Sequence, residues 1–355
     1  MNDCAGALRR IIATQGPISL AEFMRIALTD PASGYYVRRD PISGDFITAP
    51  EISQIFGELI GLFFVQVWED RGRPQRFHLV ELGPGRGTLM ADLLRAARIR
   101  PQFVDAASIH LVEISPRLRA IQQRALAAAN PVWHTELSEI TPDAPVFVVA
   151  NEFFDALPVR QFIHSGGAWH ERKIGLDGNG FRFCTDASPA PEHNIPRQFR
   201  GAPEGSIFEF SEDARRLAEQ IAGLVVQTRG VALIIDYGHA RSGLADTFQA
   251  VKGHLFADPL TSPGEADLTC HVDFAALRAA ACARGADVFG PVAQLHFLTK
   301  LGIRERAEML KRSAADYASM IDSGVERLVN ASQMGALFKT MGLSSPATPA
   351  LPGFA

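Results

Sequence analysis

The sequence predicts an α/β protein with a doubly wound, mostly parallel sheet. Three observations lead to this fold class. Continuous Val/Ile/Leu-rich runs recur along the middle of the chain, at residues 77–82, 109–114, 131–134, 146–150 and 231–236. Helical stretches separate most of these runs, as expected of strands that are covered on both faces. The first crossover, from Leu82 to Ile109, is long enough to contain a helix.

Length and composition agree with a folded protein of two units, or of one large domain with additions. The chain has 355 residues, of which 47% are hydrophobic and 21% are charged, so it can bury a core. With 35 Lys and Arg against 39 Asp and Glu, the net charge is −4. Because this balance lacks the basic excess of nucleic-acid binders, we predict no nucleic-acid partner.

The cysteines and the N-terminus indicate an intracellular protein without a metal. Cys4, Cys184, Cys270 and Cys282 form no C-x-x-C pair and lack metal-ligand spacing with histidine, which favours reduced thiols and no metal site. No apolar run reaches the ~18–20 residues of a membrane span. Residues 1–16 resemble neither a signal peptide nor a clear mitochondrial presequence. We therefore expect a cytoplasmic bacterial protein.

Residues 1–75 are predicted to form an N-terminal helical extension that acts as a lid. Ser19 and Glu22 have the spacing of a capping box, as do Thr48 and Glu51. The helices that follow should end near residues 29 and 70. The Gly-, Pro- and Ser-containing stretch 34–46 between them is predicted to be a loop.

Residues 76–300 are predicted to form the core, with insertions at about 160–210 and 237–269. The first insertion is predicted to be a β insertion, with a hairpin at Asp177-Gly-Asn-Gly180. A helix at 273–284 and strands near 286–289 and 294–298 should complete the core. Residues 301–355 are predicted to form a C-terminal helical segment, up to about residue 341, and then a frayed tail.

The glycine-rich segment directly after the first strand indicates the kind of ligand. It reads Glu81-Leu-Gly-Pro-Gly-Arg-Gly-Thr88, which is G-x-G-x-G, and so it is neither the dinucleotide fingerprint nor a P-loop. Glycines let a ligand approach the backbone, and the acidic Glu81 suits a cation better than a phosphate. S-adenosylmethionine, a sulfonium with an ammonium group, fits this pattern. The alternative is a plain tight turn. The predicted cofactor-binding residues here are Glu81, Gly83, Pro84, Gly85 and Gly87.

Glu113 strengthens the cofactor hypothesis. It follows the second strand at the carboxyl edge of the sheet, where ligands bind in open α/β folds. A carboxylate at that position can accept hydrogen bonds from both ribose hydroxyls. The alternative is an acidic residue at the N-terminus of a helix that Ser115 caps.

A polar cluster follows the fourth strand. The segment Asn151-Glu-Phe-Phe-Asp155 combines three polar side chains with phenylalanines. Acids in an apolar cleft are candidates for function, and the alternative is capping and solvation of a loop. No G-x-S-x-G elbow occurs, so Ser/His/Asp hydrolysis has no support.

Three motifs together resemble the MidA family. They are Glu81-Leu-Gly-Pro-Gly-Arg-Gly-Thr-Leu-Met90, Asn151-Glu-Phe-Phe-Asp-Ala-Leu-Pro158 and Gly44-Asp-Phe-Ile-Thr-Ala-Pro-Glu-Ile-Ser53, and the resemblance covers about residues 17–300. It implies a class I S-adenosylmethionine methyltransferase fold with a seven-stranded sheet. It also implies protein arginine methylation in complex I assembly, namely symmetric dimethylation of the 49-kDa-type subunit of respiratory complex I.

An arginine acceptor gives the acidic residues a role. A guanidinium group is always charged and has no spare lone pair. Glu152 and Asp155 can hold it by paired hydrogen bonds and localise its charge away from the attacking nitrogen, so they are the predicted catalytic residues. Asn151 is predicted to fix the cofactor or the loop.

The remaining candidates are substrate or lid residues, namely Asp45, Phe46, Thr48, Glu51, Tyr237 and His239. The first four precede or begin a predicted helix, and a capping box with a solvated loop explains them equally well. Tyr237 and His239 follow the fifth strand and can face the cleft, although a structural role is the alternative for His239.

Two rival functions stay open. One is a class I methyltransferase for a small molecule, and the other is an assembly chaperone that uses the cofactor structurally. The N-terminal extension, the β insertion and the long 237–269 loop favour a protein substrate. The sequence leaves the oligomeric state open, a homodimer included.

Overall fold

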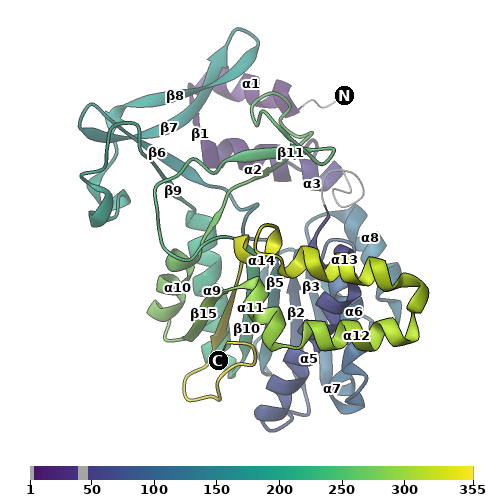
Figure 1. The fold of residues 1–355 in the computed structure, drawn as a ribbon. Coiled ribbons are helices and arrows are strands. Elements are labelled where there is room, and N and C mark those ends of the chain that lie inside the picture. Colours follow the sequence, from purple (N-terminus) through teal and green to yellow (C-terminus); the bar gives the residue numbers. More distant parts are fainter. Residues whose placement is uncertain (1–3, 39–46, 355) are drawn as a thin grey trace. The chain divides into compact units, whose positions relative to one another are not determined.

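The computed structural model of the protein describes residues 4–38 and 47–354, and the chain divides into two compact units (Figure 1). The first unit consists of residues 1–46, 155–216 and 242–271. The second consists of residues 47–154, 217–241 and 272–355. Each unit is therefore assembled from segments that are far apart in the sequence.

A mostly parallel sheet forms the centre of the second unit. Its strands follow the order β15-β16-β10-β5-β2-β3-β4, and the short β14 (Val272–Asp273) pairs with β10. The strands are β2 (Phe77–Leu82), β3 (Ala107–Val112), β4 (Val132–His134), β5 (Val146–Asn151), β10 (Val231–His239), β15 (Asp287–Ala293) and β16 (Phe338–Ser344). Only the pairs that involve β16 are antiparallel along this path. The predicted doubly wound sheet is confirmed.

The order of the strands reverses beside β2. The chain leaves β2 towards β3 and β4, and then returns to β5 on the other side of β2. In open α/β sheets, ligands bind outside the carboxyl ends of the strands at such a switch point. The segments that follow β2, β3 and β5 are therefore the first place to look for a site.

Helices surround this sheet. They are α4 (Ala49–Ile52), α5 (Gln54–Asp70), α6 (Thr88–Ala97), α7 (Pro101–Ala106), α8 (Pro116–Ala125), α10 (Phe274–Ala283), α11 (Gln294–Lys300), α12 (Ile303–Ser313), α13 (Ala318–Val329) and α14 (Met334–Leu337). Another helix, α9 (Glu212–Thr228), runs from the first unit into the second. Short 3-10 turns, at Ala127–Ala129, Leu137–Glu139 and Ala315–Tyr317, complete the unit.

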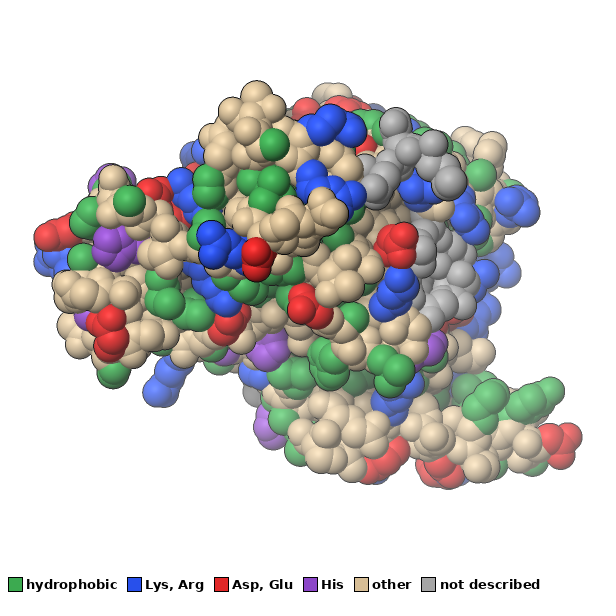
Figure 2. Space-filling model, turned by 90° about the horizontal axis from the view of Figure 1, so that it is seen from above, with side chains coloured by type: hydrophobic (Ala, Val, Ile, Leu, Met, Phe, Trp, Pro, Cys, Tyr) green, Lys and Arg blue, Asp and Glu red, His purple; other side chains and the backbone are tan. Residues whose placement is uncertain are grey.

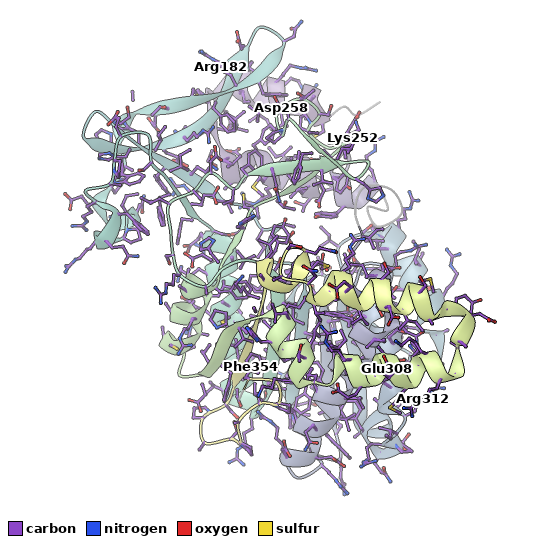
Figure 3. All side chains as sticks on the ribbon, in the orientation of Figure 1. Arg182, Lys252, Asp258, Glu308, Arg312 and Phe354 are labelled. Carbon is purple, nitrogen blue, oxygen red and sulfur yellow. The ribbon has the colours of Figure 1, made fainter. Side chains whose placement is uncertain are left out.

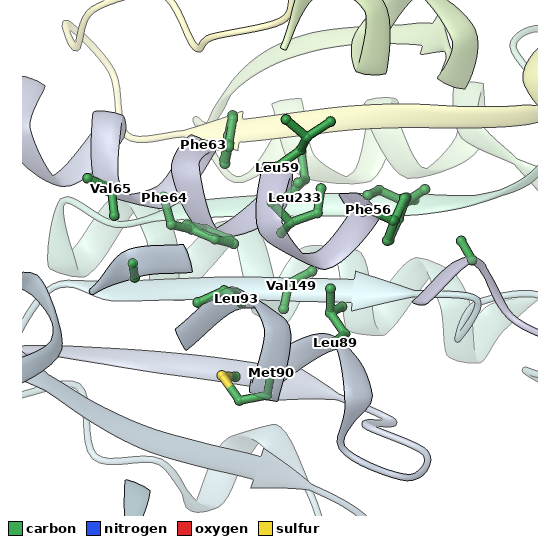
Figure 4. Close-up of a cluster of buried hydrophobic side chains, with 14 of the residues drawn as sticks. Phe56, Leu59, Phe63, Phe64, Val65, Leu89, Met90, Leu93, Val149 and Leu233 are labelled. Carbon is green, nitrogen blue, oxygen red and sulfur yellow. The ribbon is translucent and has the colours of Figure 1, made fainter. Parts of the chain in front are cut away.

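The core of the second unit is rich in aromatic rings. Phe56, Phe63 and Phe64 of α5 belong to the same cluster of buried side chains as Leu89 and Leu93 of α6 (Figure 4). All five side chains are buried. Burial of such side chains stabilises a fold by about 1.5–3 kcal/mol each. This packing fixes α6, whose first turn follows the glycine-rich segment.

The first unit is built on a smaller antiparallel sheet. It contains α1 (Cys4–Gln15), α2 (Leu20–Thr29) and α3 (Tyr35–Arg38), with strands β1 (Ile18–Ser19), β6 (Arg160–Ser165), β7 (Ala168–Asp177), β8 (Gly180–Pro189) and β9 (Ile207–Phe210). A second sheet holds β11 (Gln249–Lys252), β12 (Leu255–Ala257) and β13 (Asp267–Thr269). There are 3-10 turns at Glu192–Asn194 and Arg197–Phe199.

Two local predictions in the first unit are confirmed. The Ser19 hydroxyl caps α2 by accepting a hydrogen bond from the Glu22 N–H at 3.1 Å. Asp177 pairs with Gly180 at the end of the β7–β8 hairpin. Both features form between residues that are close together in the sequence, so a local sequence pattern is sufficient to predict them.

The helix predicted after Thr48 differs from the structure. The Thr48 side chain makes no capping bond to α4, which has only four residues. The chain is extended at Ser53, with a φ of −156°, and the Ser53 hydroxyl accepts a hydrogen bond from the Ile55 N–H at 3.3 Å. The long helix therefore begins one turn later than predicted, under a different cap.

The C-terminal predictions were partly wrong. The strand predicted near residues 294–298 is helix α11, and the predicted frayed tail follows a strand, β16, that pairs with both β10 and β15. Leu351 is buried, and the ring of Phe354, labelled in Figure 3, lies 5.2 Å from the ring of Phe297. The prolines of this tail prevent regular structure, but they do not prevent packing against the core.

The boundaries of the two units differ from the predicted three-part division. Helix α5 belongs to the unit with the large sheet rather than to a separate N-terminal extension. The two predicted insertions correspond approximately to the segments 155–216 and 242–271, which join the first 46 residues in one unit. The lid role of that unit stays a prediction.

On the face shown in Figure 2, the basic and acidic side chains are interspersed. None of the helices in the described ranges 4–38 and 47–354 is long and apolar enough to span a bilayer.

Candidate active site

The glycine-rich loop between β2 and α6 needs glycine for its backbone shape. Gly83, Gly85 and Gly87 all have positive φ values, of 62°, 53° and 84°, which side chains with a Cβ rarely adopt. A Cβ at Gly83 would also lie 2.5 Å from Cδ2 of Phe153. The loop thus passes directly against the turn that follows β5.

Two carboxyl groups lie where the neighbouring strands β2 and β3 end. Glu81 is the second-last residue of β2, and Glu113 directly follows β3. Glu81 and Glu113 are both buried, and Glu81 Oε2 has no hydrogen-bond partner. Burial, together with the charge of Glu113, raises the pKa of Glu81 to about 8. The pKa of Glu113 is also raised, mainly by burial. A cation or a set of hydroxyl donors would relieve this cost of burial.

Glu113 is already oriented by hydrogen bonds. Its Oε1 accepts from the Ser115 N–H at 2.8 Å, and its Oε2 accepts from Gln122 Nε2 at 3.2 Å. Ser115 caps α8 through its hydroxyl, so the predicted capping role is confirmed for this serine. A carboxylate has about four acceptor positions, which leaves capacity for a ligand.

Gln122 joins the glycine-rich loop to Glu113, and the sequence did not reveal it. Its Nε2 donates to the Gly85 carbonyl at 2.7 Å as well as to Glu113, while its Oε1 accepts from the Trp133 indole at 2.9 Å. The side chain is fully buried. Two glutamines are adjacent in α8, at 122 and 123, so the sequence alone could not select between them.

The turn after β5 holds Asn151 and Glu152 in an unusual geometry. Glu152 has a positive φ of 51°, which is uncommon for a residue with a side chain and is found at functional sites. Its Oε1 accepts from Asn151 Nδ2 at 3.1 Å and from the Ala49 N–H at 2.8 Å. Asn151 Oδ1 is buried without a hydrogen-bond partner.

The predicted lid residues fall into two groups. Asp45 and Phe46 lie outside the described residues. Thr48 directly precedes α4 and Glu51 lies within it, where Glu51 Oε1 accepts a hydrogen bond from the Thr88 hydroxyl at 2.5 Å. Because Thr88 is the first residue of α6, helix α4 contacts both the end of the glycine-rich loop and, through Ala49, Glu152. The role of Thr48 and Glu51 towards a substrate stays a prediction.

Tyr237 and His239, at the end of β10, make contacts that fit a structural role. The ring of Tyr237 lies 5.5 Å from the ring of Phe338. His239 Nε2 lies 3.9 Å from Asp273 Oδ2, and a third of the His239 side chain is exposed. Their predicted role at the substrate stays a prediction.

Asp155 belongs to the first unit, where its surroundings are acidic. It is buried. The pKa of Tyr36 is raised well above its usual value, first by burial and then by the charges of Asp267 and Asp155. The Tyr36 hydroxyl donates to Asp267 Oδ1 at 2.6 Å. Asp267 lies more than 100 residues further along the chain. No local sequence pattern groups Asp267 with Asp155, because only the folded first unit brings both near Tyr36.

Comparison with known proteins identifies the family. The model of the Methyltransf_28 family, described as S-adenosyl-L-methionine-dependent methyltransferases, matches residues 59–292. The chain belongs to this family. The resemblance to MidA proteins is thereby confirmed, and the protein is an S-adenosylmethionine-dependent methyltransferase.

Relatives resemble the chain over most of its length. The protein arginine methyltransferase NDUFAF7 homolog of Drosophila melanogaster is 38% identical over 96% of this chain and 84% of its own. Human mitochondrial NDUFAF7, also named a protein arginine methyltransferase, is 36% identical over 94% and 81%.

A solved structure supports both the fold and the cofactor. A Burkholderia thailandensis protein crystallised with S-adenosyl-homocysteine has a TM-score of 0.86 and 29% identity, covering 99% of this chain and 94% of that one. The same fold, the class I methyltransferase fold, is therefore present here.

The site residues fit this cofactor. S-adenosylmethionine has an ammonium group and two ribose hydroxyls as donors. Two buried acceptor atoms at the switch point, Glu81 Oε2 and Asn151 Oδ1, lack partners. Glu113 has remaining acceptor capacity. We propose that Glu81 faces the ammonium group and Glu113 the ribose, with the glycine-rich loop beneath them.

The raised pKa of Glu81 gives a pH-dependent prediction. Without ligand, Glu81 is mostly protonated below its pKa of about 8. An ammonium group favours the carboxylate, so binding should release a proton, and affinity for S-adenosyl-homocysteine should rise with pH up to about 8, by at most about tenfold per unit.

Calorimetry in two buffers with different ionisation enthalpies measures this proton release. Glu81→Gln should abolish it. Adenosine, which lacks the ammonium group, should show no such release. Equal release with adenosine and S-adenosyl-homocysteine would contradict this assignment of Glu81.

The proposed role of Glu113 predicts an equal loss for both cofactor forms. Hydrogen bonds to a charged group are worth about 1.5–3 kcal/mol, so Glu113→Ala should weaken S-adenosylmethionine and S-adenosyl-homocysteine by about 10- to 150-fold. Asp105→Ala, which removes an exposed acid in α7, is the matched control and should leave both affinities unchanged. Weakening of only the methylated form would refute the assignment, because both forms contain the ribose.

Proposed function

We propose that this protein transfers the methyl group of S-adenosylmethionine to an arginine side chain of a protein substrate. The observation that carries the proposal is the position of Glu152: a carboxylate in a left-handed turn, directly after β5 and at the switch point of the sheet. The relatives named as protein arginine methyltransferases support it.

The chemistry requires an acceptor nitrogen with available electrons. The cofactor supplies a methyl group activated by its sulfonium. A guanidinium delocalises its charge and its lone pairs over the planar group. Glu152, by accepting hydrogen bonds from one edge of the group, draws positive charge towards itself and leaves electron density on the other nitrogen. With the cofactor bound, the electron pair of the broken S–C bond would stay on sulfur as the N–C bond forms, and Glu152 would be the base that takes up the proton lost by the nitrogen.

Asp155 is the second acid in the proposal. It is buried, so a cation that it binds would exchange water for a charge-assisted hydrogen bond in a medium of low dielectric constant. An uncharged small acceptor would not require two carboxylates. The pair therefore favours arginine over the small-molecule alternative.

The resemblance to MidA proteins extends the proposal to the substrate. It implies the 49-kDa-type subunit of respiratory complex I, with symmetric dimethylation as the product. This part of the proposal concerns the identity of the partner and does not affect the chemistry at Glu152.

Incubation with tritiated S-adenosylmethionine and a bacterial lysate tests the proposal. After the protein and small-molecule fractions are separated, we expect label in the protein fraction with the wild type and none with Gly85→Val. Label in small molecules alone would support the small-molecule methyltransferase. Tight binding of S-adenosyl-homocysteine without any transfer would support the assembly chaperone.

A further inference from the structure

We propose that Asp236 is a positioning residue, which holds the turn after β5 in the shape that presents Glu152. This inference rests on the proposed function of Glu152. Asp236 lies in β10, beside β5 in the sheet, and its side chain is completely buried. A carboxylate at such a position is costly unless hydrogen bonds compensate for the loss of water.

The hydrogen bonds of Asp236 are directed at the turn. Its Oδ2 accepts from the N–H of Phe153 at 3.1 Å and from the N–H of Phe154 at 2.9 Å. Its Oδ1 accepts from the Tyr237 N–H at 2.9 Å. One buried oxygen therefore binds the two backbone groups that directly follow Glu152.

A second contact attaches the other side of the turn to the same strand. The N–H of Glu152 donates to the carbonyl of Ile235 at 2.9 Å. The backbone N–H groups of Glu152, Phe153 and Phe154 thus all donate hydrogen bonds to two adjacent residues of β10, Ile235 and Asp236. This over-determination explains how a glutamate keeps a φ of 51°, a strained conformation that would otherwise relax.

The same turn is packed against the glycine-rich loop. The ring of Phe153 occupies the space that a Cβ at Gly83 would need. The direction of the Glu152 side chain and the position of the Phe153 ring are therefore set together. Through its hydrogen bonds to the backbone of the turn, Asp236 holds both the Glu152 side chain and the Phe153 ring in position, and it takes no part of its own in methyl transfer.

Positioning and general stabilisation of the sheet predict different results. If Asp236 acts only on stability, its substitution should lower the melting temperature and leave the kcat of the folded fraction unchanged. If it positions Glu152, kcat should fall and the amides of the turn should lose their protection from hydrogen exchange. The KM for the cofactor should stay nearly constant.

The test compares Asp236→Asn and Asp236→Ala with Thr340→Val. Thr340 is a suitable control because it is fully buried in β16 opposite Ile235, and its hydroxyl has no partner. We expect kcat to fall about tenfold in Asp236→Asn and further in Asp236→Ala, because the amide keeps one oxygen acceptor. Affinity for S-adenosyl-homocysteine should change by no more than about threefold. Thr340→Val should keep the wild-type kcat.

Hydrogen exchange of the segment 151–156 gives an independent readout. The amides of Phe153 and Phe154 should exchange slowly in the wild type and in Thr340→Val, and much faster in both Asp236 variants. Fast exchange in the wild type would overturn the inference even if neither Asp236 variant folds. Unchanged kcat and unchanged protection in a folded Asp236→Ala would overturn it as well.

Glu152→Gln separates this inference from the proposed function. Full activity of Glu152→Gln would refute the proposed role of Glu152, whereas loss of protection in the Asp236 variants would still support the positioning of the turn. Loss of activity in Glu152→Gln, with normal activity in both Asp236 variants, would refute the positioning alone.

Discussion

Gly85→Val should abolish cofactor binding and leave the protein folded. Gly85 has a φ of 53°, a conformation that a β-branched side chain disfavours strongly. Its carbonyl also accepts the hydrogen bond from Gln122 that joins the loop to Glu113. We expect the affinity for S-adenosyl-homocysteine in calorimetric titration to fall by at least about a hundredfold, about 2.7 kcal/mol.

A matched glycine controls for backbone strain. Gly178, at the tip of the β7–β8 hairpin, has a φ of 55° and open space around its Cβ position. Gly178→Val therefore introduces a similar strain at a turn of the first unit, whereas the glycine-rich loop belongs to the second. It should keep wild-type affinity, and both variants should keep a native circular dichroism spectrum. Normal affinity in Gly85→Val would remove this loop from the cofactor site.

Glu152→Gln should lose methyl transfer while it keeps the cofactor. The amide preserves the shape of the side chain but removes its charge and one of its two acceptor groups. Charge-assisted bonds in a desolvated site are stronger than neutral ones, so we expect transfer to fall by about tenfold or more, at least about 1.4 kcal/mol. Affinity for S-adenosyl-homocysteine should stay within about threefold, which is under 1 kcal/mol.

Two further protein variants and one altered substrate peptide make this result specific. Asp155→Asn should lose activity in the same way, whereas Glu69→Gln, which changes an exposed ion pair with Arg73 and Arg100, should be fully active. A substrate peptide with lysine in place of the target arginine should accept no methyl group, because an ammonium cannot match the planar fork. Parallel loss of cofactor affinity and activity in Glu152→Gln would place Glu152 in the cofactor pocket instead.

The features that the sequence predicted are encoded locally. The glycine-rich loop, the strands β2 to β5 and the Ser19 cap each depend on residues that are close together in the chain. Glu113 and Glu152 could be predicted as site residues for the same reason. Each directly follows a strand, and parallel strands end at one edge of the sheet.

The features that the sequence missed depend on distant partners. Strand β16 has helical neighbours in the sequence, and only its pairing with β10 and β15 makes it a strand. Asp236 was part of a predicted strand, and nothing local indicated that its carboxylate binds the backbone some 80 residues earlier. Gln122 likewise gains its role only when α8 brings it to both Gly85 and Glu113.

Tandem mass spectrometry of a labelled product tests the central claim most directly. The wild-type protein is incubated with S-adenosylmethionine that carries a deuterated methyl group and with bacterial lysate, and the labelled proteins are digested and fragmented. We predict that the heavy methyl group lies on a side-chain nitrogen of arginine, and that the label disappears with Glu152→Gln. Heavy methyl groups found only on lysine, on carboxylates or on small molecules would contradict the account.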